Sequence, residues 1–292
     1  MNKLENNNLI IESKLSGAEL TRIYSKKFNK EVLWNGDAKF WGRHSPILFP
    51  IVGRLKDNET IIEDNSYNMN QHGFARDMEF EIIDNDDISI TYKLISSENT
   101  KSYYPYDFEL IIKYTLLDTG VNVNWIVNNI DSKDIYFSIG AHPAFNINFG
   151  ENNDLSNYYL EFKAKDNVNK ISLDGPYSNE ILSVDNLDTI YLSPKLFEKD
   201  AIIYTNIDGI NIKSKKEDNY INISFNNFPL VGIWSPYYKD SNSIAPFICI
   251  EPWYGLADNV NTDKIYKNKN YINKLSIGES FNVSYSINIE KE

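Results

Sequence analysis

The sequence has one cysteine, three histidines and no long apolar run, and each scarcity argues against a class of protein. Cys249 has no second cysteine with which to form a disulfide within the chain, and its apolar neighbours predict a buried small hydrophobe. No stretch of about 18 apolar residues occurs, so no transmembrane helix is expected. The first residues lack the apolar segment of a secretory signal, which predicts a cytoplasmic protein.

Basic residues are also scarce, because 29 Lys and Arg stand against 41 Asp and Glu, for a net charge of −12. Such a chain repels phosphate backbones and anionic lipid surfaces, which makes nucleic acid and membranes poor partners. A neutral small molecule such as a sugar fits better. A phosphorylated ligand would need a local basic patch. We expect a monomer or homodimer.

Sequence motifs for cofactors and nucleophiles are missing as well. The chain has neither Gly-x-Gly-x-x-Gly nor a phosphate-cradling Gly-Lys-Ser/Thr loop, and it has no Gly-x-Ser-x-Gly. Neither His72 nor His142 begins a short His-x-Asp/Glu pair, and no Cys-x-x-Cys occurs. No cofactor and no metal are therefore predicted. A glycosidase-type pair of carboxylates stays open, since acidic residues are plentiful but no local motif selects two of them.

What the sequence does contain is alternation of apolar and polar residues with a period of two. This pattern covers residues 121–127, 221–225 and 281–289, and predicts half-buried strands. Residues 108–117 are a further β-rich run, and the turn 118–120 would join them to 121–127 as a hairpin. Other strands are expected at 20–25, 31–34, 80–83, 88–94, 135–139, 158–162, 201–205, 210–213, 231–234 and 247–251. The fold class is predicted to be all-β, with packed antiparallel sheets.

Helical periodicity is scarce, and its best candidate is residues 193–198, with Ser193 as N-cap and Pro194 as the first helical residue. No internal repeat and no Pro/Gly/Ser-rich linker is visible. We therefore expect residues 1–292 to form a single domain.

The candidate chemical groups are two histidines and one glutamate. His72 and His142 each lie among Gly, Pro and aromatic residues, where a strand gives way to a rigid turn, whereas His44 has no such support and is interpreted as structural. Glu251 ends the apolar run 245–250, which predicts a strand covered on both faces and a partly desolvated carboxylate. Pro252 should stop this strand, and Trp253 offers a flat face for a sugar ring. The alternatives are hydrogen-bonded structural histidines and a glutamate facing water.

Five segments, at 48–55, 71–76, 104–110, 140–145 and 250–255, together resemble the aldose 1-epimerase, or galactose mutarotase-like, family in matching order. The chain is most similar to the lactose-operon-associated branch of that family. The resemblance implies a β-supersandwich of large antiparallel sheets with a sugar cleft. It also implies His142 as general acid, Glu251 as general base, His72 near the ring oxygen, Arg54 as a donor to hydroxyls, and Asp200 as a substrate-binding carboxylate.

The resemblance thus predicts a cofactor-independent isomerase that interconverts the α and β anomers of a hexose. Ordinary pKa values of about 6.5 for His and 4.3 for Glu allow both groups to be charged near neutrality, as an acid and a base. Residues 140–143 depart from the galactose-type surround of the second histidine. Met78 stands near where hexose-6-phosphate epimerases carry a tryptophan. Two alternatives therefore remain: a hexose-6-phosphate 1-epimerase and a non-catalytic carbohydrate-binding protein.

Overall fold

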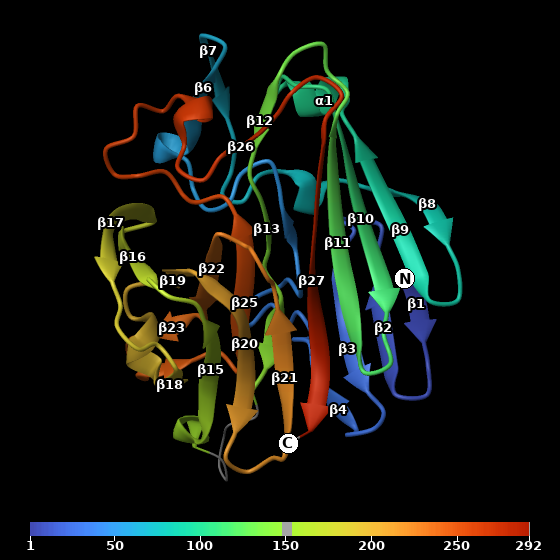
Figure 1. The fold of residues 1–292 in the computed structure, drawn as a ribbon, viewed down its shortest axis with the longest axis vertical. Coiled ribbons are helices and arrows are strands. Elements are labelled where there is room, and N and C mark those ends of the chain that lie inside the picture. The colour runs from blue at the N-terminus through green and yellow to red at the C-terminus, as the bar shows by residue number, and fades with distance from the viewer. Residues whose placement is uncertain (148–153, 292) are drawn as a thin grey trace.

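Two large antiparallel sheets dominate a computed structural model of the protein, which describes residues 1–147 and 154–291. Figure 1 shows them as layers, with β27, β11 and β10 at the front. The nine-stranded sheet has the order β18 (Thr189–Tyr191), β15 (Tyr158–Ala164), β20 (Ile207–Ser214), β21 (Asn219–Ser224), β27 (Ser280–Lys291), β11 (Gly120–Asn129), β10 (Phe108–Leu116), β9 (Ser89–Ile95) and β8 (Glu81–Asn85). The eight-stranded sheet has the order β17 (Tyr177–Ser183), β16 (Asn169–Asp174), β19 (Ile202–Thr205), β22 (Leu230–Trp234), β25 (Phe247–Tyr254), β13 (Ile139–Ala141) and β5 (Ile47–Leu48), and β14 (Ala144–Asn146) also pairs with β25.

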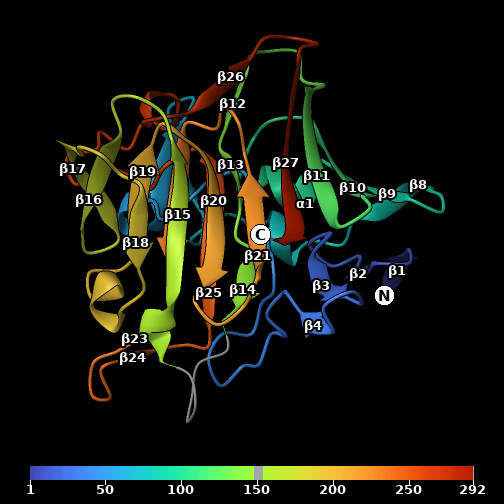
Figure 2. The ribbon, with the colours of Figure 1, turned by 60° about the horizontal axis from the view of Figure 1, so that its bottom comes forward.

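Smaller elements surround these sheets. A four-stranded sheet of β1 (Asn2–Glu5), β2 (Leu9–Ser13), β3 (Leu20–Ser25) and β4 (Lys30–Glu31) lies near β9 and β10 (Figure 2). Two-stranded pairs are β6 (Glu59–Ile62) with β7 (Asn65–Asn68), β12 (Ile135–Phe137) with β26 (Asn273–Leu275), and β23 (Tyr237–Tyr238) with β24 (Ser243–Ile244). The helices are α1 (Glu98–Lys101), η1 (Lys56–Asn58), η2 (Ala75–Asp77), η3 (Leu155–Asn157), η4 (Pro194–Phe197) and η5 (Tyr266–Asn268). In the described ranges, no helix has the length and apolarity that a membrane span requires.

The predicted all-β class and the predicted hairpin are confirmed. Strands β10 and β11 pair in antiparallel register from Phe108 opposite Asn129 to Leu116 opposite Val121. Along β10 every second side chain is buried, as the sequence alternation requires for a strand with one face on the core.

Three local predictions need correction. Residues 193–198 form only the 3-10 turn η4, and the Ser193 side chain makes no capping hydrogen bond. The strand expected at 31–34 is reduced to β4 and an isolated bridge at Leu33. The strand expected at 135–139 breaks at Ser138, because the Ser138 N–H donates to the Pro50 carbonyl at 2.6 Å instead of continuing one ladder.

The prediction that Pro252 ends its strand is wrong, since β25 continues to Tyr254. The Ile250 N–H donates to the Pro143 carbonyl. Backbone nitrogens two residues apart on a strand point toward the same neighbouring strand, so the nitrogen of Pro252 faces this side as well. On that side β13 ends at Ala141 and β14 begins at Ala144, so the ladder is already interrupted there. Pro252 has no N–H to donate, but the ladder on that side is interrupted, so the proline costs no strand hydrogen bond.

Strand β25 separates the main core from the candidate site. Ile248 and Ile250 point into the core between the two large sheets. Cys249 and Trp253 belong to clusters on the opposite face of the sheet, and Glu251 lies between them in sequence with the same parity. Both faces are covered, as the apolar run predicted, but only one of them lies on the main core.

Candidate active site

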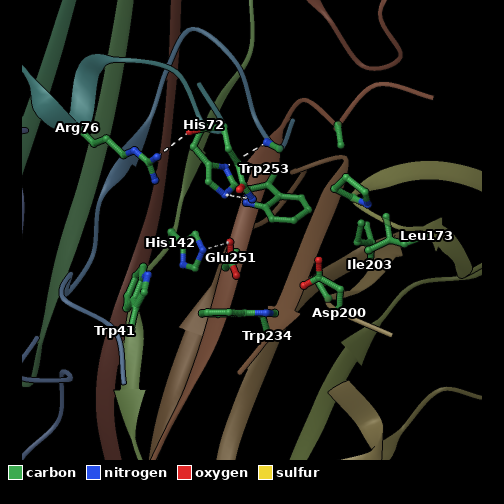
Figure 3. A pocket seen from close by; sticks show the side chains of 15 residues that line it. Trp41, His72, Arg76, His142, Leu173, Asp200, Ile203, Trp234, Glu251 and Trp253 are labelled. Carbon is green, nitrogen blue, oxygen red and sulfur yellow. Dashed lines mark hydrogen bonds and ion pairs between the residues drawn. The ribbon is translucent and has the colours of Figure 1, made fainter. Parts of the chain in front are cut away.

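His142 and Glu251 meet where the eight-stranded sheet is interrupted. His142 occupies the gap between β13 and β14, directly beside the middle of β25. Its Nε2 lies 3.3 Å from Oε2 of Glu251 (Figure 3). The exposed fractions are 7% for His142 and 1% for Glu251, so the alternative of a glutamate facing water is wrong. Residues 109 positions apart in sequence thus form one buried pair.

The pair lies at a cavity of about 320 Å³. This volume is near the lower end of the range of about 300–1,000 Å³ for small-molecule sites, which suits a single sugar ring. The walls come from strands β16, β19, β22 and β25 and from several loops. The lining residues are Trp41, Gly53, Gln71, His72, Arg76, His142, Leu173, Pro176, Asp200, Ala201, Ile203, Trp234, Glu251, Trp253 and Ala257.

Three tryptophans shape the cavity. Trp41 stacks on the His142 imidazole with ring centroids 4.8 Å apart, and Trp234 meets the same ring edge-on at 85°. Trp253 is buried and its indole N–H donates to the Ala141 carbonyl at 3.2 Å. A Cβ on Gly232 would lie 2.3 Å from the Trp253 ring, so this glycine leaves the space that the indole occupies. The imidazole is therefore held between aromatic rings.

His72 is fixed beside the pair by the backbone. Its φ of 68° is left-handed, and Nδ1 accepts a hydrogen bond from the Gly53 N–H at 3.1 Å. In the neutral ring the proton therefore resides on Nε2, so Nε2 cannot accept a hydrogen bond from the Gln71 amide nitrogen 3.3 Å away and is left to donate elsewhere. The ring lies edge-on to His142 at 5.4 Å between centroids. Burial, together with the neighbouring His142, lowers the pKa of His72 well below its ordinary value, so His72 is a neutral donor.

Arg76, rather than Arg54, is the arginine that lines the cavity. The Arg76 side chain is mostly buried and donates to the Gln71 carbonyl at 2.7 Å. Its Nε makes no hydrogen bond, and burial with neighbouring Arg43 lowers its pKa to about 10. Arg54 is exposed and donates to the side chain of the lining residue Gln71 at 3.0 Å. The role expected of Arg54 stays a prediction.

Asp200 lines the cavity beyond Glu251 as seen from His142 (Figure 3). It follows η4 and precedes β19, with a φ of 73°, and its N–H donates to the Phe197 carbonyl. The side chain lies on the Glu251 side of the cavity in Figure 3. After burial, its proximity is the second cause that raises the pKa of Glu251.

Burial reverses the ionisation that ordinary pKa values predict for the pair. Desolvation, with a smaller effect of Asp200, raises the pKa of Glu251 well above its usual value. Desolvation, and then the positive charge of Arg76, lowers the pKa of His142 to about 3. Both shifts favour a neutral carboxyl group beside a neutral imidazole over the ion pair in the sugar-free site. This state differs from the carboxylate–imidazolium pair only in which of the two groups carries the proton that they share.

The structure brings five predicted site residues together around one cavity: His72, His142, Asp200, Glu251 and Trp253. His44 lies elsewhere, with Nδ1 3.6 Å from the buried Glu19 carboxylate, which agrees with a structural role. Sequence reasoning named Arg76 only as a phosphate-binding candidate for the phosphosugar alternative, and it did not select Trp41, Gln71 and Trp234. Trp234 could have been selected from the sequence, because it lies on the same face of the predicted strand 231–234 as Gly232. Trp41 lies in a loop without periodicity and gave no such signal.

The family model described as aldose 1-epimerase matches residues 1–269. The chain belongs to the aldose 1-epimerase family. The family predicted from the five segments is thereby confirmed, and with it a relationship to sugar epimerases and mutarotases.

Similar proteins agree with this membership. The LacX protein of Lactococcus lactis subsp. lactis is 29% identical over 98% of both chains, in keeping with the predicted branch. Two solved structures each have a TM-score of 0.93. One is a galactose mutarotase related enzyme from Lactobacillus acidophilus, 31% identical, covering 99% of this chain and 97% of that one. The other is a galactose mutarotase-like protein from Lactobacillus casei, 30% identical, covering 99% and 100%. The predicted supersandwich of antiparallel sheets is confirmed.

Proposed function

We propose that this protein is an aldose 1-epimerase that interconverts the α and β anomers of a hexose. The observation that carries the proposal is the 3.3 Å separation of His142 Nε2 and Glu251 Oε2 at a cavity of sugar size. Anomer exchange needs one group to remove the proton of the anomeric hydroxyl and another to protonate the ring oxygen. Both oxygens are bonded to C1, so the two groups have to lie within a few ångströms of each other and within hydrogen-bonding reach of the sugar.

In the proposed reaction, Glu251 takes the proton from the anomeric hydroxyl while His142 protonates the ring oxygen. The C1–ring oxygen bond breaks, the open-chain aldehyde rotates about C1–C2, and reclosure with the roles reversed gives the other anomer. The His72 Nε2–H and the Arg76 guanidinium are placed to donate to sugar oxygens. Trp234 supplies an apolar face beneath the ring.

The ionisation of the pair has to change when the sugar binds. A sugar hydroxyl that donates to Glu251 stabilises its carboxylate, because a hydrogen bond to the charged form lowers a pKa. The proton can then move over the 3.3 Å contact to His142, whose positive charge is stabilised by the new carboxylate. No proton has to enter or leave the site.

A hexose phosphate is the second candidate substrate. The buried Arg76 Nε has no hydrogen-bond partner, and Arg43 lies close enough to depress the pKa of Arg76. The Asp77 carboxylate lies 2.8 Å from Arg43 and 3.8 Å from the Arg76 Nε, so two guanidinium groups share one carboxylate and leave a net positive charge in a chain whose net charge is −12. A phosphate at this end of the cavity would gain charge-assisted hydrogen bonds from it.

The test is polarimetric measurement of anomerisation over a panel of free and phosphorylated aldoses. Glu251→Gln and His142→Asn should each lower the rate by about 10²–10⁴-fold, since this is the typical contribution of one acid or base. His44→Asn is the matched control, because the same change outside the cavity should leave the rate unaltered.

Each other outcome has a defined meaning. Acceleration confined to phosphosugars selects the second substrate. Sugar binding without acceleration of any anomerisation would instead favour a non-catalytic carbohydrate-binding protein. A wild-type rate in Glu251→Gln would refute the proposed base.

A further inference from the structure

The third side chain beside the buried pair is Cys249. It precedes Glu251 by two residues on β25, so both side chains lie on the same face of the strand. One ligand atom each from His142, Cys249 and Glu251 lies within 4.8 Å of the other two. All three residues are buried. Over residues 1–147 and 154–291, no other group of three His, Cys, Asp or Glu side chains meets this criterion.

Two buried atoms of this group make no hydrogen bond, although such atoms are normally satisfied in protein interiors. Glu251 Oε2 has only the ion-pair contact of 3.3 Å to His142 Nε2, and His142 Nδ1 is the ring nitrogen that does not make this contact. Nitrogen, carboxylate oxygen and thiolate sulfur are the donors that Zn²⁺ and similar cations prefer. The donor set and its unused coordination capacity therefore point to a ligand other than sugar.

We propose that His142, Cys249 and Glu251 form an inhibitory site for a thiophilic divalent cation such as Zn²⁺. Tetrahedral coordination at metal–ligand distances of about 2.0–2.3 Å places ligand atoms about 3–4 Å apart, so the side chains close in by about 1 Å. His142 and Glu251 line the cavity, which leaves room for a fourth ligand such as water, whereas Cys249 lies in the apolar cluster against which the cavity residues Trp41 and Trp234 pack.

Charge balance makes the bound state compatible with burial. Zn²⁺ displaces one proton from the Cys249 thiol and one from the Glu251 carboxylic acid, and both protons pass to solvent. The dication with one thiolate and one carboxylate is then neutral, whereas an uncompensated buried charge would be costly. The predicted inhibition rests on the proposed function, because the metal occupies the acid and the base at once; the predicted metal binding does not.

The experiment titrates the full-length protein, kept reduced, with Co²⁺ as a spectroscopic substitute for Zn²⁺. Wild type should show visible bands of a four-coordinate site and a thiolate-to-metal charge-transfer band, and Zn²⁺ should abolish both. Cys249→Ala should lose the charge-transfer band and bind at least about tenfold more weakly, because even an outer-shell change costs about 10–100-fold in affinity. His44→Asn, which leaves all three ligands in place, should retain the wild-type spectrum.

Activity measurements form a separate arm. Zn²⁺ should inhibit anomerisation by wild type, and Cys249→Ala should remain active and be at least about tenfold less sensitive. If Cys249→Ala does not fold, as judged by circular dichroism, His142→Asn provides the second variant, which lacks one ligand and should bind Co²⁺ at least about tenfold more weakly. A wild-type spectrum without the charge-transfer band, or equal Co²⁺ affinity in Cys249→Ala, overturns the site. Because the spectra need no sugar, a failed anomerisation assay leaves this test intact.

Discussion

Two side chains of the cavity, His142 and Glu251, are buried with polar atoms that make no hydrogen bond, which is an unfavourable arrangement. Glu251 is a carboxyl group in the interior with one oxygen unpaired, and His142 has an unpaired ring nitrogen. An acid and a base that must exchange protons with a sugar cannot be fully satisfied by the protein, since the sugar has to provide those hydrogen bonds. The unpaired atoms thus lower the stability of the sugar-free fold, a trade-off that functional sites commonly show.

Replacing the glutamate should therefore stabilise the protein while it removes activity. The pKa of Glu251 is raised in the fold relative to about 4.5 when unfolded, so its contribution to stability is fully present below pH 4.5 and is lost as pH rises toward the folded pKa. Glu251→Gln does not titrate. Its gain in unfolding free energy over wild type should be at least about 1 kcal/mol at pH 8, since one pKa unit corresponds to about 1.4 kcal/mol.

Urea unfolding at pH 5 and pH 8 measures this difference. The gain should be larger at pH 8, and Glu180→Gln, the same change at an exposed position, should give no comparable effect. A Glu251→Gln variant less stable than wild type at pH 8 would contradict the burial argument.

At the scale of elements, the site depends on close approach between strands. β13, β22 and β25 are neighbours, and Trp253 on the central strand covers Gly140 on one side and Gly232 on the other. Cβ atoms there would approach the indole to 2.6 and 2.3 Å. The two glycines are thus required by packing, and the position of one wall of the cavity follows from them.

Gly232→Ala should displace the Trp253 indole. Overpacking of this kind costs about 1–3 kcal/mol, and the shifted ring would intrude on the cavity, so sugar affinity should fall together with the unfolding temperature. Gly42→Ala is the matched control, because a Cβ there meets only Ala38 at an ordinary 3.8 Å. Thermal unfolding and sugar titration of both variants test the expectation, and an unchanged unfolding temperature in Gly232→Ala would speak against it.

On the scale of the whole molecule, one apolar cluster joins the two large sheets and the N-terminal strands. It extends from Leu4 to Ile289 and includes Ile250 of the site strand. The chain buries this core without any disulfide. Because all sheets share this core, unfolding of one sheet would expose apolar surface of the others to water, which is unfavourable.

We expect the 292 residues to unfold as one domain. Tryptophan fluorescence reports mainly on the cavity side, where Trp34, Trp41, Trp234 and Trp253 lie, and Trp125 reports on the nine-stranded sheet. Far-ultraviolet circular dichroism reports on all strands. The two urea transitions should coincide, as in cooperative unfolding. Separate midpoints would show that the chain contains more than one folding unit.

By itself the sequence determined the β class, the long strands and the identity of the acid and base candidates. Alternation survives in strands such as β10 because one face meets a core and the other meets water. The segments around His142 and Glu251 stand out by composition and by family resemblance. Neither signal depends on what lies far away in the chain.

The tertiary structure decided the rest, because those properties arise only when distant segments meet. Pro252 lies inside a strand since β13 and β14 leave a gap beside it, a fact that no local pattern contains. Arg76 rather than Arg54 lines the cavity, and Trp41 reaches His142 from a loop 101 residues earlier. The favoured protonation state of the pair also follows from burial. Ionisation depends on the surrounding dielectric and charges, and the fold sets both.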